Sequence, residues 1–158
     1  MYYLKDTVDT DAAIQQLEIY IESFPIKLKQ FSSEELLKRS APGKWSKQEI
    51  VGHLIDSAIN NLKRFTEIQF LPQPYTVISY RQNELVLING YQNLPLQHLL
   101  DLWKSLNSQI VFVGKNIPAD KLNYRVNTHD ENKELKTLSW IICDYVAHME
   151  HHCRQIFR

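Results

Sequence analysis

The chain is poor in residues that would indicate several common classes of protein. Only four of its 158 residues are glycine, and none lies in a GxGxxG or Walker-type phosphate loop, which excludes nucleotide folds built on those motifs. Its two cysteines, Cys143 and Cys153, lie ten positions apart, with no CxxC pattern and no disulfide framework around them. This cysteine usage fits a reducing compartment.

Long apolar runs and an excess of charge of one sign are also missing. No segment approaches the roughly 20 apolar residues of a membrane-spanning helix, and residues 1–6 do not begin a signal peptide. Eighteen Lys and Arg residues balance eighteen Asp and Glu residues, whereas proteins that bind nucleic acid or anionic membranes carry a basic surplus. We therefore expect a cytoplasmic protein that binds a small-molecule substrate and neither nucleic acid nor membrane.

The composition that remains is typical of one globular domain, spanning residues 1–158. Hydrophobic residues make up 44% of the chain and charged residues 23%. A chain of this length buries roughly 70% of its unfolded surface when it folds, so its core needs neither disulfides nor a structural metal. A metal ion bound by this chain would therefore have a functional role.

Apolar residues recur every three or four positions in four segments, which is the spacing of helices that pack on helices. The segments cover, approximately, residues 10–31, 47–70, 96–114 and 137–157. Pro25 either kinks the first helix or restarts it. Ser46 followed by Glu49 predicts a capping box at the start of the second. The pattern predicts an all-α four-helix bundle.

Two connections are long for a minimal bundle. Residues 72–93 follow the second helix and could include a short helix over residues 80–89, and residues 115–136 form a polar link before the last helix. Neither connection shows the alternation of apolar and polar residues that predicts a strand. Connections of this length favour a bundle with a crossover.

The histidines are the concentrated chemistry of the chain. Three of the six lie in the sequence HMEHH at the end of the last helix. At about 100° per residue, His148 and His152 fall on the apolar face of that helix and His151 at its rim. A single buried histidine is usually a hydrogen-bonded core residue. Two buried imidazoles four positions apart can instead bind one metal ion.

The spacing matches neither of two well-known metal motifs. Met149 stands where the HExxH motif requires Glu, and the Glu-x-x-His motif of di-iron bundles does not occur on two helices. A mononuclear catalytic site usually takes three protein ligands. His53 would be near the pair if the second and fourth helices are antiparallel, although its helical-wheel position predicts the surface. We expect no metal role for His98 and His129.

Two segments carry a resemblance to a known family. Residues 41–57, with the sequence APGKWSKQEIVGHLIDS, resemble the first motif of the DinB-like (YfiT-like) metalloenzyme superfamily, together with Asn60, Asn61 and Arg64. Residues 137–156, TLSWIICDYVAHMEHHCRQI, resemble its C-terminal motif. The resemblance extends over nearly the whole chain. It implies an up-down-down-up four-helix bundle with a long crossover between the second and third helices.

The resemblance also implies a divalent metal, often nickel or zinc, held by three histidines. Carried over by position, these histidines are His53, His148 and His152. Asp56 and Asp144 are then candidates to accept hydrogen bonds from the imidazoles, and Arg64 to contact an anionic substrate group. Each of these three is also explained as a solvated charge. The family resemblance is compatible with a homodimer.

Members of this superfamily with assigned activities are mostly thiol transferases, which join bacillithiol, mycothiol or glutathione to electrophiles, or isomerases with a thiol cofactor. The expected function is therefore the transfer of a low-molecular-weight thiol to an electrophile. A metal with an open position would acidify water as well as a thiol, which leaves a metal-dependent hydrolase as the alternative. A non-catalytic bundle that binds a small molecule or partner, with a structural or vestigial histidine site, is an alternative of another class.

Overall fold

The computed structural model of this protein describes residues 8–129 and 134–158. The start of the chain, where no signal peptide is predicted, lies outside the described residues, as do positions 130–133 of the predicted polar link. None of the helices in the described part of the chain is long and apolar enough to cross a membrane.

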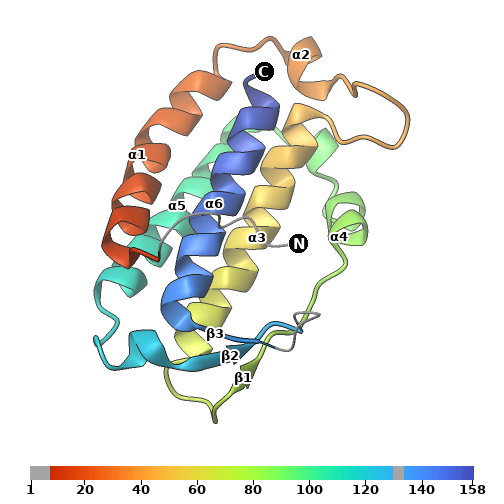
Figure 1. Cartoon of the computed structure of the whole chain (residues 1–158). Coiled ribbons are helices and arrows are strands. Elements are labelled where there is room, and N and C mark those ends of the chain that lie inside the picture. The colour runs from red at the N-terminus through yellow and green to blue at the C-terminus, as the bar shows by residue number, and fades with distance from the viewer. Residues whose placement is uncertain (1–7, 130–133) are drawn as a thin grey trace.

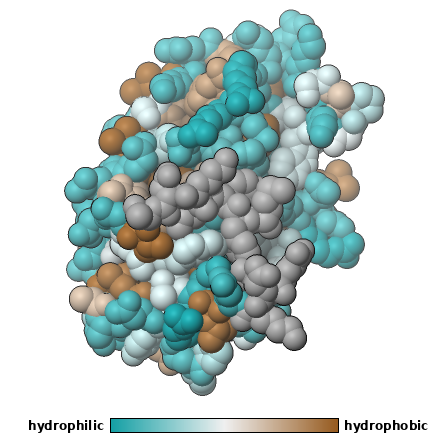
Figure 2. All heavy atoms as spheres, viewed as in Figure 1, coloured by the Kyte–Doolittle hydropathy of each residue, from teal (hydrophilic) through white to brown (hydrophobic). Residues whose placement is uncertain are grey.

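Four long helices form the body of the molecule (Figure 1). In the view of Figure 1 the first helix runs upward, the second and third run downward and the fourth runs upward. They are α1 (Thr10–Leu28), α3 (Lys47–Glu67), α5 (Leu96–Lys115) and α6 (Leu138–Ile156). This arrangement confirms the predicted fold class, an up-down-down-up four-helix bundle. The crossover lies where it was predicted, between the second and third of these helices. The face of the molecule in Figure 2 is mostly hydrophilic with scattered hydrophobic residues, as expected when the helices turn their apolar sides inward.

Helix starts follow the local sequence closely. Ser46 accepts a hydrogen bond from the backbone N–H of Glu49, and the Glu49 carboxylate accepts one from the backbone N–H of Ser46, which is the predicted capping box. A second capping box starts the short helix α2 (Ser33–Leu37). Pro25 neither breaks nor restarts α1, because it lies in the last turns, where the buried Phe24 and Leu28 hold the helix against the core.

The crossover runs back along α3 and is attached to it. It contains strand β1 (Tyr75–Thr76), helix α4 (Gln82–Ile88) and the 3-10 turn η1 (Tyr91–Asn93). The Tyr91 ring packs so closely on Gly52 that a Cβ added there would lie 2.1 Å from a ring carbon. Tyr91 and Asn89 also donate hydrogen bonds to Asp56, over 2.7 and 2.9 Å. These contacts cover one side of α3.

The expectation that the links contain no strand was wrong. β1 pairs in parallel with β2 (Arg125–Asn127), which pairs antiparallel with β3 (Leu135–Thr137). The link also contains the turn η2 (Lys121–Asn123). Strands of two or three residues are too short to show alternation in the sequence. Val126 of β2 is fully buried, and Figure 1 shows the three strands at the lower end of the bundle.

Candidate metal centre

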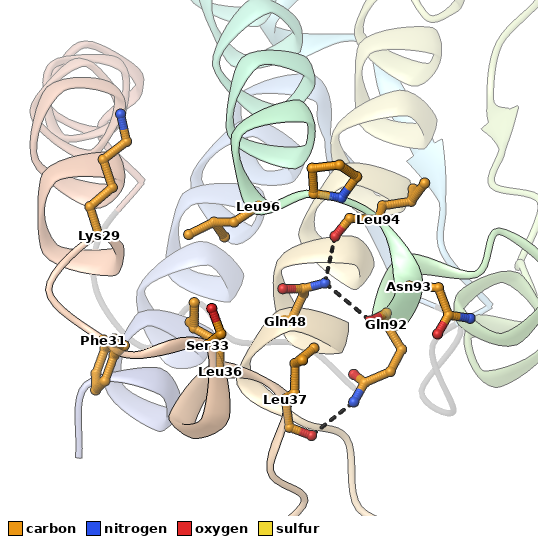
Figure 3. A pocket seen from close by; sticks show the side chains of 11 residues that line it. Lys29, Phe31, Ser33, Leu36, Leu37, Gln48, Gln92, Asn93, Leu94 and Leu96 are labelled. Atoms are coloured by element: carbon orange, nitrogen blue, oxygen red, sulfur yellow. Dashed lines mark hydrogen bonds between the residues drawn. The ribbon is translucent and has the colours of Figure 1, made fainter.

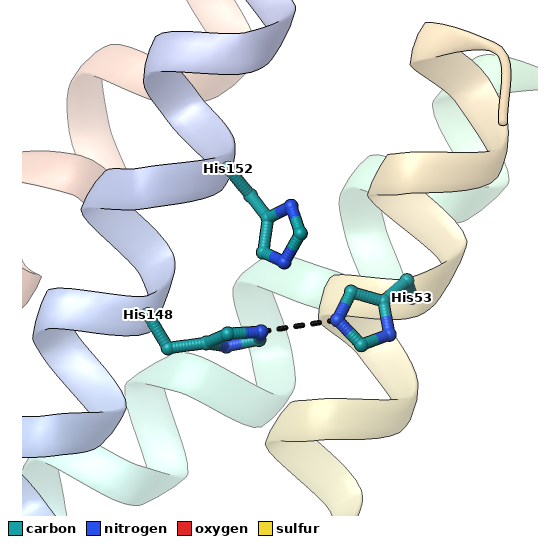
Figure 4. Close-up of side chains that lie close together, drawn as sticks. All are labelled: His53, His148 and His152. Atoms are coloured by element: carbon teal, nitrogen blue, oxygen red, sulfur yellow. Dashed lines mark hydrogen bonds between the residues drawn. The ribbon is translucent and has the colours of Figure 1, made fainter. Parts of the chain in front are cut away.

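Helices α3 and α6 bring three histidines together inside the bundle (Figure 4). His53 lies in the second turn of α3, and His148 and His152 lie in the last turns of α6. Because the two helices run in opposite directions, these turns are neighbours. One ring nitrogen from each histidine lies within 4.8 Å of the other two, and His53 Nε2 is 3.0 Å from His148 Nε2. The three side chains are at most 8% exposed.

Burial keeps these imidazoles neutral. Removal from water lowers the pKa of His53 to about 3, with a further contribution from His152. The same effect, with repulsion from the neighbouring histidines, lowers the pKa of His148 to about 2. For His152, burial lowers the pKa to about 4 against the opposing effect of its hydrogen bond with Gln155. Neutral imidazole is the form that coordinates a metal ion.

The donor set fits a divalent transition metal. Three imidazole nitrogens facing one point suit zinc, nickel or copper, and three protein ligands leave a position for water or substrate. His53 Nδ1 is buried with no hydrogen-bond partner among the described residues, so the cluster is not explained as a closed hydrogen-bond network. In the described part of the chain, no other set of three His, Cys, Asp or Glu side chains converges in this way.

Two side chains that were not predicted orient the α6 imidazoles. His152 Nδ1 lies 2.7 Å from Gln155 Oε1, and His148 Nδ1 lies 3.3 Å from the Ser57 hydroxyl. These contacts leave the Nε2 atoms for a metal ion. Asn61 in turn donates to the Ser57 hydroxyl over 3.3 Å. Gln155 could have been found in the sequence, since it lies three positions after His152 on the same helix.

The three charged residues that the sequence nominated are not among the groups that converge in the histidine cluster. Asp56 is buried, but its carboxylate accepts hydrogen bonds from Tyr91 and Asn89 and none from an imidazole. Burial raises the Asp56 pKa, and these hydrogen bonds oppose the rise. Asp144 is half-buried on α6 and is not one of the converging groups. Arg64 donates to Asn61 and to the backbone carbonyl of Ile78.

The remaining histidines lie on the surface. His98 and His129 are exposed and are not among the three converging groups. His151 is also exposed, at the rim, as predicted from the helical wheel. Its Nε2 lies 3.1 Å from the side-chain nitrogen of Gln155, so it belongs to the surroundings of His152.

The surface position predicted for His53 from periodicity alone was wrong. Residues 48–58 of α3 are all buried, because the crossover covers one side of the helix and the bundle covers the other. A helix buried on all sides has no polar face from which an orientation can be read. The Trp45 ring, 4.8 Å from the His53 ring between centroids, covers the imidazole further.

The sequence of this chain matches a known protein family. The family model described as the DinB superfamily matches residues 14–156. The chain belongs to the DinB superfamily. This family membership agrees with the resemblance in the two histidine-containing motifs.

The proteins similar to this chain include a sequence relative and solved structures with the same fold. A protein of Oceanobacillus iheyensis, named "Putative metal-dependent hydrolase OB0413", is 25% identical over 90% of this chain and 80% of its own length. YfiT from Bacillus subtilis, described as "a probable metal-dependent hydrolase with an unusual four-helix bundle topology", superimposes with a TM-score of 0.81 and 23% identity, over 98% of this chain and 89% of that one.

Another solved structure with this fold is that of a mycothiol-dependent maleylpyruvate isomerase. It matches with a TM-score of 0.66 and 14% identity over 92% of this chain, which spans 60% of the isomerase. At these identities the two structural matches establish a shared fold, and the site must be argued from the residues of this chain.

Proposed function

We propose that this protein is a metal-dependent enzyme in which His53, His148 and His152 hold a divalent ion, nickel or zinc. The proposed reaction is the transfer of a low-molecular-weight thiol to an electrophile. The observation that carries the proposal is the convergence of three buried, neutral imidazoles from two helices.

The reaction needs a thiolate at neutral pH. A divalent ion with an open position lowers the pKa of a bound thiol or water. A thiolate bound near the three histidines would form a bond to the electrophilic carbon, the leaving group would depart with the bonding electrons, and the thiol proton would pass to solvent. His148 and His152 stay oriented because Ser57 and Gln155 hold their Nδ1 atoms. Arg64, half-buried on α3, could contact an anionic group of the thiol or substrate.

Hydrolysis is the second candidate. The names of the Oceanobacillus relative and of YfiT favour it, since both refer to a metal-dependent hydrolase. The same three histidines would serve both reactions, with water in place of the thiol as the nucleophile. The thiol-dependent isomerase with the same fold favours the first candidate. A homodimer, as the family resemblance suggests, would be compatible with either reaction.

Metal content tests the site directly. Inductively coupled plasma mass spectrometry of untagged protein, purified without chelators, is expected to find about one nickel or zinc ion per chain. His148→Ala and His152→Ala should lose the ion, because two imidazoles bind a divalent metal too weakly to survive purification. His98→Ala is the matched control, since His98 is exposed on α5, and should keep it. A metal-free wild type after reconstitution would refute the proposal.

Activity then separates the two reactions. Metal-loaded protein should accelerate the reaction of glutathione or bacillithiol with 1-chloro-2,4-dinitrobenzene, and His148→Ala should lose this rate. Metal-dependent hydrolysis of 4-nitrophenyl acetate, with no effect of the protein on thiol transfer, would instead favour the hydrolase. A protein that binds metal and accelerates neither reaction would support the non-catalytic alternative.

A further inference from the structure

A recess lies at the end of the bundle where α3 begins, and no residue of the histidine cluster lines it (Figure 3). Its volume is about 650 Å³, which is within the usual range of small-molecule sites. Its walls come from the segment after α1, from α2, from the first turn of α3 and from the segment between η1 and α5. It is therefore assembled from three stretches of the chain, residues 29–37, Gln48 and residues 92–96.

Hydrogen bonds hold the walls of this recess in place. The Gln92 side chain donates to the backbone carbonyl of Leu37 over 2.8 Å and accepts from the Ser46 hydroxyl over 2.6 Å. It thus connects α2, the start of α3 and η1. A recess with fixed walls needs little reorganisation when a ligand binds, which favours affinity.

Gln48 presents a fixed hydrogen-bond acceptor to the recess. Its amide nitrogen donates to the backbone carbonyls of Tyr91, Gln92 and Leu94, over 2.8, 3.3 and 2.9 Å. Because carbonyls only accept, the orientation of the amide is determined and its oxygen points into the recess, as Figure 3 shows. Gln48 is only 4% exposed, and no described residue donates to this oxygen.

The rest of the lining sets the charge and polarity of a ligand. Leu36, Leu94 and Leu96 provide apolar surface, and Leu36 is only 3% exposed. Lys29 is the sole charged side chain among the lining residues, and none of them is a carboxylate. A cation would therefore find no carboxylate here. An uncharged molecule with an apolar body and a hydrogen-bond donor matches both the leucine surface and the Gln48 oxygen.

We propose that this recess is a second binding site, for a small uncharged molecule that carries an amide N–H on a short apolar body. The N–H donates to the Gln48 side-chain oxygen, and the apolar body packs on Leu36, Leu94 and Leu96. The Gln48 oxygen is accessible from the open recess, so the ligand N–H replaces a hydrogen bond to water there, and burial of the apolar body supplies the favourable free energy. The site is independent of the proposed metal.

A matched pair of probes tests the proposal. Cyclohexanecarboxamide carries N–H donors, and its N,N-dimethyl derivative has the same apolar body without them. In methyl NMR spectra of the full-length protein, the first compound should shift the resonances of Leu36, Leu94 and Leu96 in a saturable manner. The dimethyl derivative should bind at least about tenfold more weakly, the equivalent of 1.4 kcal/mol. Zinc and a chelator should leave both results unchanged.

Two leucine variants locate the site without disturbing the core. Leu37 lines the recess and is 39% exposed, so Leu37→Trp should fill it and abolish the saturable shifts. Leu87 is 78% exposed on α4, away from the recess, and Leu87→Trp should bind like wild type. The absence of saturable shifts in wild type, equal binding of the two probes, or unchanged binding by Leu37→Trp would each overturn the proposal.

Discussion

The hydrogen bond between Gln155 and His152 connects an exposed side chain to the buried histidine cluster. The Gln155 oxygen can only accept, so the His152 proton lies on Nδ1 and the Nε2 lone pair is available for a metal ion. Partners of this kind typically contribute tenfold to a hundredfold to metal affinity. Because Gln155 is exposed, its role can be tested without a large loss of stability.

Replacement of Gln155 should weaken metal binding and leave the fold intact. We expect Gln155→Ala to lower zinc affinity by about 10–100-fold in a competition titration with a chromophoric chelator. The free energy of unfolding should change by no more than about 0.5 kcal/mol. Gln155→Glu should restore affinity, because a carboxylate also accepts from Nδ1. Arg154→Ala, an exposed neighbour, is the control, and equal affinity in Gln155→Ala would contradict this role.

At the scale of a single element, the start of α3 determines the position of His53. Glu49 closes the capping box and also forms an ion pair with Arg39, which precedes the helix. Burial raises the pKa of Glu49. Hydrogen bonds from Arg39 and Ser46, together with the positive charge of Arg39, lower it by more, so the net result is a lowered pKa. The ionised carboxylate is therefore favoured in the folded state.

The contribution of Glu49 to stability should depend on pH. A lowered pKa in the folded state stabilises the protein above the unfolded pKa, near 4.5, and this stabilisation is lost as the pH falls through the folded value. We expect Glu49→Gln to lower the free energy of unfolding by about 1–2 kcal/mol at pH 7. In urea denaturation, its difference from wild type should shrink below about pH 4.5. A constant difference from pH 7 to pH 4 would contradict this account.

At the scale of the whole molecule, the histidine cluster connects the second and the last long helices. His53 and the two α6 histidines are 95 or more positions apart in the sequence, so a shared ion would cross-link distant parts of the fold. A ligand that binds only the folded state stabilises it by an amount that grows with its concentration, about 2.7 kcal/mol at a hundredfold excess over Kd.

Metal should therefore raise the melting temperature of this protein. At a hundredfold excess of zinc or nickel over Kd, we expect an increase of roughly 5–10 °C by differential scanning calorimetry. His53→Ala should show little increase over its own metal-free value, whereas His98→Ala should respond like wild type. An equal increase in His53→Ala would show that the ion binds elsewhere.

The sequence by itself determined the features that depend on local spacing. Apolar positions three and four apart predicted the long helices, and the capping pair Ser46 and Glu49 predicted where α3 begins. Four-residue spacing placed His148 and His152 on one face of α6, and both are buried there. The two motifs indicated the family, and with it the crossover topology that the structure confirms.

Tertiary structure alone decided the features that depend on contacts between distant segments. His53 is buried because the crossover and α6 cover α3 from different sides, which the periodicity of α3 cannot report. The strands pair across about 50 residues of sequence, between Tyr75 and Val126. The recess at Gln48 likewise needs three separate segments. Periodicity describes one element and its own faces, whereas burial depends on which other elements pack against it.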